Sequence, residues 1–366
     1  MQDLLLGFQK FTWGNAVMFA VGGLLIYLAI KKDYEPMLLL PIGFGAILAN
    51  IPFSSAIGEG GFLTTLFNAG ISNELFPVLI FIAVGAMIDF TPLLQNPGLL
   101  FFGAAAQFGI FFTMALAAVM GFTLKQSASI GIIGAADGPT AIYVATRLAK
   151  EYLGPITVAA YSYMALVPII QPPVIKALTT PAERRIRMEY GFNTISRPVR
   201  ILFPILVTVV AGIISPISVA LIGSLMFGNL IREAGVLERL SKAAQNELAN
   251  LVTLLLGITI GSTMTAAAFL TGDTLKIIGM GLIAFTFDTG GGVIFAKILN
   301  LFLKKKINPM VGAAGISAFP MSARVIHKMG QKEDPTNYLL MPAIAANVAG
   351  QIGSIIAGGL ILALVK

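Results

Sequence analysis

The apolar stretches of the chain are the feature that most limits its fold. They run for roughly 15 to 25 residues, the length that a helix needs to cross a bilayer core at about 1.5 Å per residue. The charged residues, 24 Lys and Arg with 17 Asp and Glu in 366 residues, gather in short clusters between these stretches. At 11% they are too few to cover a water-facing surface, because a soluble domain carries about 25%. We therefore predict an all-α, polytopic helical membrane protein, which excludes a soluble enzyme and a nucleic-acid binder.

The apolar stretches predict about ten to twelve membrane segments. We expect them at 15–30, 37–51, 75–94, 99–122, 130–148, 156–178, 201–215, 217–231, 251–270, 275–299, 310–325 and 339–365. The passage 52–72 is too polar for a simple span, so we expect it to be re-entrant or interfacial. The last stretch is either one long tilted span or two short ones. Pro and Gly are frequent inside the spans, and backbone groups freed there must be satisfied by protein or by a water-filled cavity.

The basic residues predict the orientation of the chain. Its net charge is +7, which in a membrane protein indicates an excess of Lys and Arg in cytoplasmic loops. The loop 176–200 has six basic residues against two acidic ones, so we place it in the cytoplasm and the protein in the cell (inner) membrane as a multi-pass protein. The start, Met1-Gln2-Asp3, lacks the basic region of a cleaved signal, which predicts a mature integral protein. Cys is absent, so no disulfide and no thiolate site is expected.

An internal repeat organises the chain. Asn73-Glu74-Leu75 and Asn246-Glu247-Leu248 each open an apolar run, and a Gly-rich break follows later in each half, at 134–140 and 315–321. Interrupted helices in corresponding halves of a sequence are typical of a transporter-type ion site near the midplane of the membrane. We therefore expect two repeats, inverted relative to each other, with interrupted helices; duplication without a site is the alternative.

The repeat divides the chain into four parts. Residues 1–72 form N-terminal spans and the possible re-entrant segment. Residues 73–200 form the first repeat with its broken helix and basic loop, 201–245 form connecting spans, and 246–366 form the second repeat.

Asp137 is the first candidate site residue. A carboxylate inside a membrane costs a few kcal/mol, so it is normally paired, faces a cavity and is functional. Gly138-Pro139 interrupts the helix and frees carbonyls that can join the carboxylate around Na⁺, with a hydroxyl from Thr140. The same carboxylate could hold H⁺ instead. The structural alternative is a cap for the half-helix that begins at Pro139.

The second break has its own candidates: Asn308, Gly312, Ser317 and Arg324. The Asn and Ser side chains supply neutral oxygens for a cation, and Gly312 allows close approach of backbone. Arg324 can grip a substrate carboxylate with two hydrogen bonds, or it can be a basic anchor beside His327 and Lys328.

Two further residues follow the breaks, and a third is ambiguous. Tyr163 lies on the span after Asp137 and could pass a proton, although a tyrosine in a span is more often packed. Asn347 is an amide deep in an apolar span, where it either binds a cation or joins helices. Asp288, which precedes three glycines, is open between function and structure.

These motifs resemble a known family. Gly134-Ala135-Ala136-Asp137-Gly138-Pro139-Thr140-Ala141, the run from Tyr161 to Pro173, Leu225 to Leu230, and Asn308 to Arg324 are similar to the β subunit of biotin-dependent, sodium-translocating decarboxylases. That family acts on oxaloacetate, methylmalonyl-CoA or glutaconyl-CoA, and the resemblance covers nearly the whole chain. The choice between these three substrates is left open, because the acid binds a partner subunit.

The resemblance implies a mechanism and a set of roles. The chain would take carboxybiotin from a carrier subunit, release CO₂, take up a proton and export Na⁺. By resemblance, Asp137, Tyr163 and Arg324 are catalytic, and Arg324 also binds carboxybiotin. The implied Na⁺ ligands are Asp137, Asn308, Gly312, Ser317 and Asn347.

The resemblance also implies partners. These are biotin-carrier and carboxyltransferase subunits, a small membrane-anchoring γ/δ-type subunit, and further β copies in a homotrimer within the lipid bilayer. From the residues alone, a Na⁺-coupled secondary transporter with inverted repeats fits equally well and is the alternative function.

Overall fold

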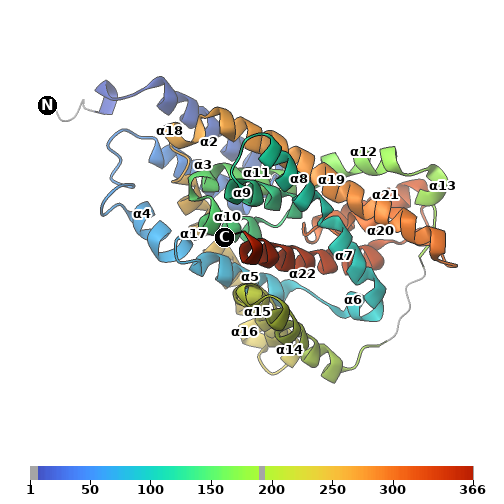
Figure 1. Cartoon of the computed structure of the whole chain (residues 1–366). Coiled ribbons are helices and arrows are strands. Elements are labelled where there is room, and N and C mark those ends of the chain that lie inside the picture. The colour runs from blue at the N-terminus through green and yellow to red at the C-terminus, as the bar shows by residue number, and fades with distance from the viewer. Residues whose placement is uncertain (1–6, 189–193, 366) are drawn as a thin grey trace.

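The structure, a computed structural model, describes residues 7–188 and 194–365. These residues form helices joined by turns, with no strand among them, which confirms the predicted all-α class (Figure 1). Met1-Gln2-Asp3, residues 189–193 of the basic loop, and Lys366 lie outside the described residues.

Seven segments of the described chain are long and apolar enough to cross a membrane. Four of them are single helices: α2 (Trp13–Lys32), α14 (Arg197–Ile214), α19 (Gly272–Phe302) and α22 (Leu340–Leu364). The other three are composite: η2 (Pro97–Leu99) with α7 (Leu100–Ala106) and α8 (Phe108–Val119), η5 (Pro216–Ser218) with α15 (Val219–Ala234), and α16 (Glu238–Ala243) with η6 (Ala244–Leu248) and α17 (Ala249–Gly261).

Two bent pairs raise the number of candidate spans to nine. The first joins α4 (Phe62–Leu66) and η1 (Phe67–Ile71) to α5 (Leu75–Met87) at 62°, so the polar passage 52–72 ends in a short helix at an angle to the next span. The second joins η4 (Lys150–Tyr152) and α11 (Leu153–Ala165) to α12 (Val167–Leu178) at 69°.

This number is lower than the ten to twelve segments expected from the sequence, because several apolar stretches form shorter helices. One is α3 (Pro36–Ala49), and others belong to the two broken segments described next. The described chain also has the short helices α6 (Thr91–Gln95), α13 (Pro181–Arg184) and α18 (Ala266–Phe269). The stretch 339–365 forms one helix, α22.

The first broken segment folds back on itself. It consists of α9 (Leu124–Gly131), η3 (Ile132–Ala135) and α10 (Gly138–Leu148). Its two ends meet, because Nε2 of Gln126 donates to Oε1 of Glu151 at 3.0 Å. A straight helix of this length would hold its ends roughly 35 Å apart at about 1.5 Å per residue. We call residues 124–148 the first hairpin, and residues 132–137 its tip.

The second broken segment also folds back. It consists of α20 (Pro309–Ala313) and α21 (Met321–Glu333). Arg184 contacts both ends: its carbonyl accepts from Nδ2 of Asn308 at 2.8 Å, and its Nε donates to Oε1 of Glu333 at 2.6 Å. We call residues 309–333 the second hairpin, and residues 314–320 its tip.

Capping residues explain where helices begin in these hairpins. Thr123 caps α9 in a capping box with Gln126, and Asp137 and Asn308 cap α10 and α20. A proline follows each of the last two caps within two positions, where its missing N–H costs nothing.

Helix α22 runs through the middle of the molecule and packs against both hairpins (Figure 1). The first hairpin lies beside its C-terminal half, where Gly358 is close to the side chain of Thr140, and the second lies beside its N-terminal half. The two hairpins therefore approach the centre from opposite directions.

The second hairpin packs on α19 through two glycines. A Cβ built on Gly292 would overlap the carbonyl oxygen of Gly312, and a Cβ on Gly312 would overlap the carbonyl oxygen of Gly292. Only glycine permits this close approach of two backbones.

This contact predicts the effect of one added methyl group. Gly292→Ala should lower the free energy of unfolding by about 1–3 kcal/mol, the usual cost of overpacking. Gly279→Ala, on the same helix but with no neighbour within 4 Å of the added Cβ, is the control and should not destabilise the protein. Thermal unfolding in detergent measures both variants, and equal midpoints would contradict the packing role.

Candidate functional site

The two tips touch each other through their backbones. The N–H of Ser317 in the second tip donates to the carbonyl oxygen of Ala135 in the first tip at 3.1 Å. Both residues are almost completely buried. The structure therefore brings together the two Gly-rich breaks that the sequence singled out.

Asp137 lies beside this contact and is 3% exposed. Its Oδ2 accepts hydrogen bonds from the hydroxyls of Thr140 at 2.8 Å and Ser354 at 2.7 Å. Its Oδ1 accepts from the N–H of Thr140 at 3.3 Å. The carboxylate thus caps α10, which is the structural role that the sequence offered as an alternative for Asp137. Among the described residues no basic side chain pairs with it, so its charge is available to a cation.

Three polar side chains of α22 hold the tips. Nδ2 of Asn347 donates to the carbonyl of Ile316 at 2.5 Å, and Nε2 of Gln351 donates to the carbonyl of Ser317. Ser354, one turn further, reaches Asp137. Residues 347, 351 and 354 share one helix face because they are four and three positions apart. This face therefore bonds to both tips.

The amide of Asn347 has an unused acceptor. Its Oδ1 atom is buried and has no hydrogen-bond donor among the described residues. A buried polar atom without a partner is costly, and a bound cation would satisfy it. The hydroxyl of Ser317, in contrast, already has a partner, because it donates to the carbonyl of Gly350 at 2.8 Å. A hydroxyl that donates one bond still offers lone pairs to a cation.

A cavity of about 410 Å³ opens onto the site. Its floor includes Asp137, Ser317 and Gln351, all buried. Its rim includes the exposed residues Met87 and Asn250. Most of the wall between them is apolar, from α5 and α17. The buried carboxylate is therefore accessible from one side of the protein.

The rim lies on the same face as the basic end of α14. Nη1 of Arg232 donates to the carbonyl of Met87 at 2.7 Å. Arg232 neighbours Glu233, which pairs with Arg200 at 3.5 Å in the first turn of α14. Because Arg200 ends the basic loop 176–200, the rim of the cavity and the C-terminal end of that loop lie on one face.

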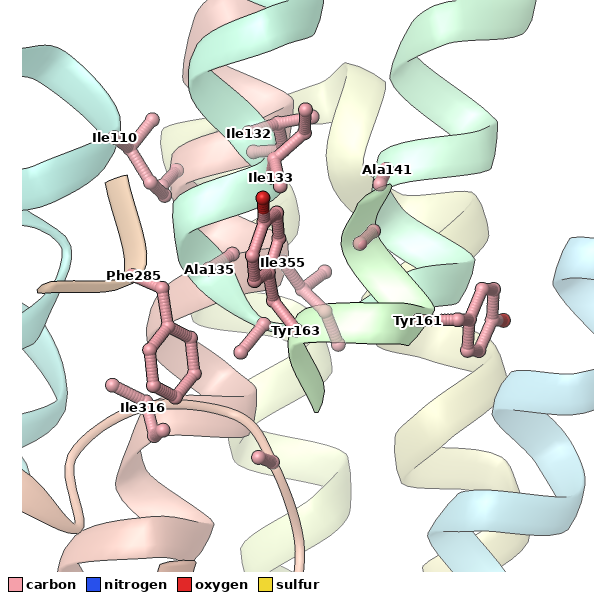
Figure 2. Packing of buried hydrophobic residues seen from close by; sticks show 14 of the residues in the cluster. Ile110, Ile132, Ile133, Ala135, Ala141, Tyr161, Tyr163, Phe285, Ile316 and Ile355 are labelled. Carbon is pink, nitrogen blue, oxygen red and sulfur yellow. The ribbon is translucent and has the colours of Figure 1, made fainter. Parts of the chain in front are cut away.

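The two tyrosines of α11 point in different directions (Figure 2). Tyr161 lines the cavity beside Pro139, and its ring is packed against Gly138. Tyr163 is packed against Gly281 of α19 and donates its hydroxyl to the carbonyl of Ile278. The structure thus places Tyr161, which sequence reasoning missed, next to Asp137.

Asn308 and Gly312 do not line the cavity. Asn308 donates to the carbonyls of Arg184 and Ile186 at 2.8 Å each, and its Oδ1 accepts from Met310. Gly312 forms the contact with α19 described above. Both residues shape the second hairpin at a distance from its tip.

Arg324 lies in the first turn of α21 and its side chain is exposed. It is four residues beyond Pro320, which lines the cavity, and no ion pair of Arg324 is described within residues 7–188 and 194–365. Its guanidinium is therefore available to an anionic group.

Asp288 is a second buried carboxylate, on α19, and is 1% exposed. It packs against Gly109 at the start of α8 and against Gly134 in the first tip. It does not line the cavity. The structure thus places it against the first tip but outside the cavity at Asp137.

Ser354, Gln351 and Tyr161 are the residues at the site that sequence reasoning missed. A signal for the first two was present, because they recur with Asn347 on one face of an apolar helix. Tyr161 carried no comparable signal, since periodicity does not tell which of two tyrosines two positions apart faces a cavity.

Comparison with known proteins gives one family. The sequence profile described as "Na+-transporting oxaloacetate decarboxylase beta subunit" matches residues 14–365. The chain is 49% identical to the methylmalonyl-CoA decarboxylase subunit beta of Propionigenium modestum, over 98% of this chain and 96% of that protein. It is 50% identical to the glutaconyl-CoA decarboxylase subunit beta of Acidaminococcus fermentans, over 98% and 95%. It is 45% identical to the oxaloacetate decarboxylase beta chain of Klebsiella pneumoniae, over 98% and 96%.

Proposed function

We propose that this chain, which belongs to the family of Na⁺-transporting decarboxylase beta subunits, decarboxylates carboxybiotin and couples CO₂ release and proton uptake to Na⁺ export. Membership makes it the membrane pump subunit of a decarboxylase complex, so a secondary transporter is set aside. One observation carries the mechanism: a buried carboxylate lies where two opposed hairpin tips meet, at the floor of a cavity.

Na⁺ binds at the tips in this proposal. Asp137 supplies the charge, Ser317 and Asn347 supply neutral oxygens, and carbonyls freed by the breaks complete the site. Oxygen ligands suit a small hard cation. The unused Oδ1 of Asn347 supports this assignment. The contacts of Asn308 and Gly312 favour a role in shaping the hairpin over direct ligation.

The basic loop 176–200 faces the cytoplasm in this proposal, in line with the positive-inside rule. The rim of the cavity shares a face with Arg200, so Na⁺ would reach Asp137 from the cytoplasm. The structure then corresponds to a state that is open to the inside.

The chemistry consumes one proton. In carboxybiotin the bond between the carboxyl carbon and the ureido nitrogen breaks, CO₂ leaves, and the nitrogen takes a proton. Arg324 would hold the departing carboxylate, since its guanidinium is exposed and unpaired in the described chain. The tyrosine hydroxyls of α11 are candidates to pass the proton.

Coupling follows from competition at one carboxylate. Asp137 cannot hold Na⁺ and H⁺ equally well at the same time, so a proton arriving from outside displaces Na⁺. A change of access between the two bindings makes the exchange directional.

The chain is one subunit of a complex, as the names of its relatives imply. We propose biotin-carrier and carboxyltransferase subunits and a small membrane-anchoring γ/δ-type subunit as partners, with the β subunit as a homotrimer. The many exposed apolar side chains of α14 suit lipid or another subunit.

Asp137→Asn tests the central assignment. Asn keeps the shape and the capping oxygen but removes the charge, so the complex should assemble while Na⁺-dependent decarboxylation of carboxybiotin falls at least a hundredfold. Turnover and ²²Na⁺ uptake in proteoliposomes measure it. Near-wild-type turnover with Na⁺ dependence intact would refute the site.

Ser317→Ala and Asn308→Ala separate ligation from positioning. Ser317→Ala should raise the Na⁺ concentration for half-maximal turnover severalfold at little change in limiting rate, because one ligand is lost and the carboxylate remains. Asn308→Ala should chiefly lower thermal stability, by about 1–3 kcal/mol, because α20 loses its cap and the carbonyls of Arg184 and Ile186 each lose the shorter of two side-chain hydrogen bonds, the other coming from Asn337. A larger Na⁺ shift for Asn308→Ala would restore it as a ligand.

Tyr161→Phe and Tyr163→Phe identify which hydroxyl handles protons. We expect Tyr161→Phe to slow decarboxylation most at high pH, where protons are scarce, because this residue lines the cavity beside the capped helix. Tyr163→Phe should keep the wild-type pH profile and lose about 0.5–1.5 kcal/mol of stability, the value of one hydrogen bond. The reverse pattern in turnover measured across pH would assign the proton transfer to Tyr163.

A further inference from the structure

The turn between α2 and α3 carries a glutamate at the mouth of the cavity. Glu35 precedes α3, and its carbonyl accepts from the N–H groups of Leu38 and Leu39 at 3.0 and 2.9 Å. Its backbone is left-handed, with φ 37° and ψ 57°. A glycine would adopt this conformation at lower cost, so the turn does not explain the presence of a carboxylate.

The side chain of Glu35 lines the same cavity as Asp137. Glu35 is half-buried and lies near the exposed Met37 and Asn250, whereas Asp137 is on the buried floor. The two carboxylates are the only charged side chains among the described residues that line this cavity. One carboxylate therefore marks the mouth of the path and the other marks its end.

The surroundings strengthen the field of these charges. The wall of the cavity is mostly apolar, and low-dielectric walls focus the field of charges in a cleft. Within the described chain, no ion pair joins Glu35 to Lys31 or Lys32, the basic residues that end α2. Among the described residues, two carboxylates and no basic side chain line this path. Arg232, which contacts the rim at Met87, is paired with Asp89 and Glu233, so the path still attracts cations.

Burial also favours a bound cation at Glu35. Loss of water around the side chain raises the pKa of the Glu35 carboxyl, which means that the bare carboxylate is disfavoured there. A cation beside it offsets that cost. Asn250 and Thr253 of α17 line the same cavity and offer neutral oxygens.

We propose that Glu35 forms an outer cation site, which holds a partly hydrated Na⁺ at the mouth of the cavity before the ion moves to Asp137. This inference rests on the proposed function, in which Na⁺ enters from the face of the basic loop. It adds a recruiting step: the outer site raises the local Na⁺ concentration, whereas the limiting rate is governed by the tips.

Glu35→Gln tests the outer site in the complete decarboxylase complex in proteoliposomes. The Na⁺ concentration for half-maximal turnover should rise about threefold or more, and turnover at saturating Na⁺ should stay unchanged. In the wild type, the Na⁺ concentration for half-maximal turnover should depend on ionic strength, adjusted with choline chloride, because salt screens the charge of Glu35. This dependence should weaken in Glu35→Gln, which lacks that charge. Glu35→Asp, which keeps the charge, should retain most of the wild-type Na⁺ dependence.

Asp33→Asn is the matched control. It removes the same charge two residues away in the same turn, at a left-handed position that Asn tolerates, and it does not line the cavity. An equal Na⁺ shift for Asp33→Asn and Glu35→Gln would overturn the proposal in favour of general surface charge. An unchanged Na⁺ dependence for Glu35→Gln would also overturn it.

The Asp137→Asn variant distinguishes this proposal from the one on which it rests. If Asp137→Asn abolishes Na⁺-dependent turnover and Glu35→Gln has no effect, only the outer site is wrong. If Asp137→Asn retains Na⁺-dependent turnover, the inner site is wrong. If Glu35→Gln alone then raises the Na⁺ concentration for half-maximal turnover, the cation site lies at the mouth instead.

Discussion

A single backbone hydrogen bond, from the N–H of Ser317 to the carbonyl of Ala135, joins the two halves of the site. Each broken helix frees polar backbone groups inside the protein, where they must be satisfied by other protein groups or by a water-filled cavity. The two tips meet part of this requirement through each other, and the side chains of Asn347 and Gln351 on α22 donate to two further tip carbonyls. The position of Asp137 depends on this arrangement, because its helix begins at the first tip.

The sequence predicted which segments meet at the candidate site better than it predicted their geometry. Two Gly-rich breaks at corresponding places in the halves, a carboxylate in the first and a serine in the second, were visible as motifs, and the structure brings Asp137 and Ser317 to one cavity. The sequence did not predict that the chain turns back at each break, because a hairpin and a kinked span have the same apolar pattern. Contacts at the open ends, such as Gln126 with Glu151, decide between them.

Packing explains the residues whose place the sequence did not reveal. Asn308 and Gly312 are residue types that could bind a cation, but both are engaged elsewhere. Asn308 donates to the carbonyl of Arg184, and Gly312 packs against the backbone of Gly292. Tyr161 and Tyr163 are two positions apart on one helix, so their side chains point in different directions. Which of them faces the cavity depends on how the helix packs against its neighbours. The division of the chain at 73, 201 and 246 stays a prediction, as does every assigned ligand role.

The cavity also determines where the membrane potential acts. In the state that we propose, open to the inside, a water-filled cavity would keep the potential at Asp137 close to that of the solution at the mouth, and most of the voltage would fall across the packed first hairpin beyond it. An ion that reaches Asp137 has crossed little of the field. In the Na⁺ export that we propose, the step that carries the ion past the tip would therefore work against nearly all of the potential, about 2.3 kcal/mol per elementary charge for each 100 mV. In this proposal the first hairpin would be the electrical insulator of the subunit.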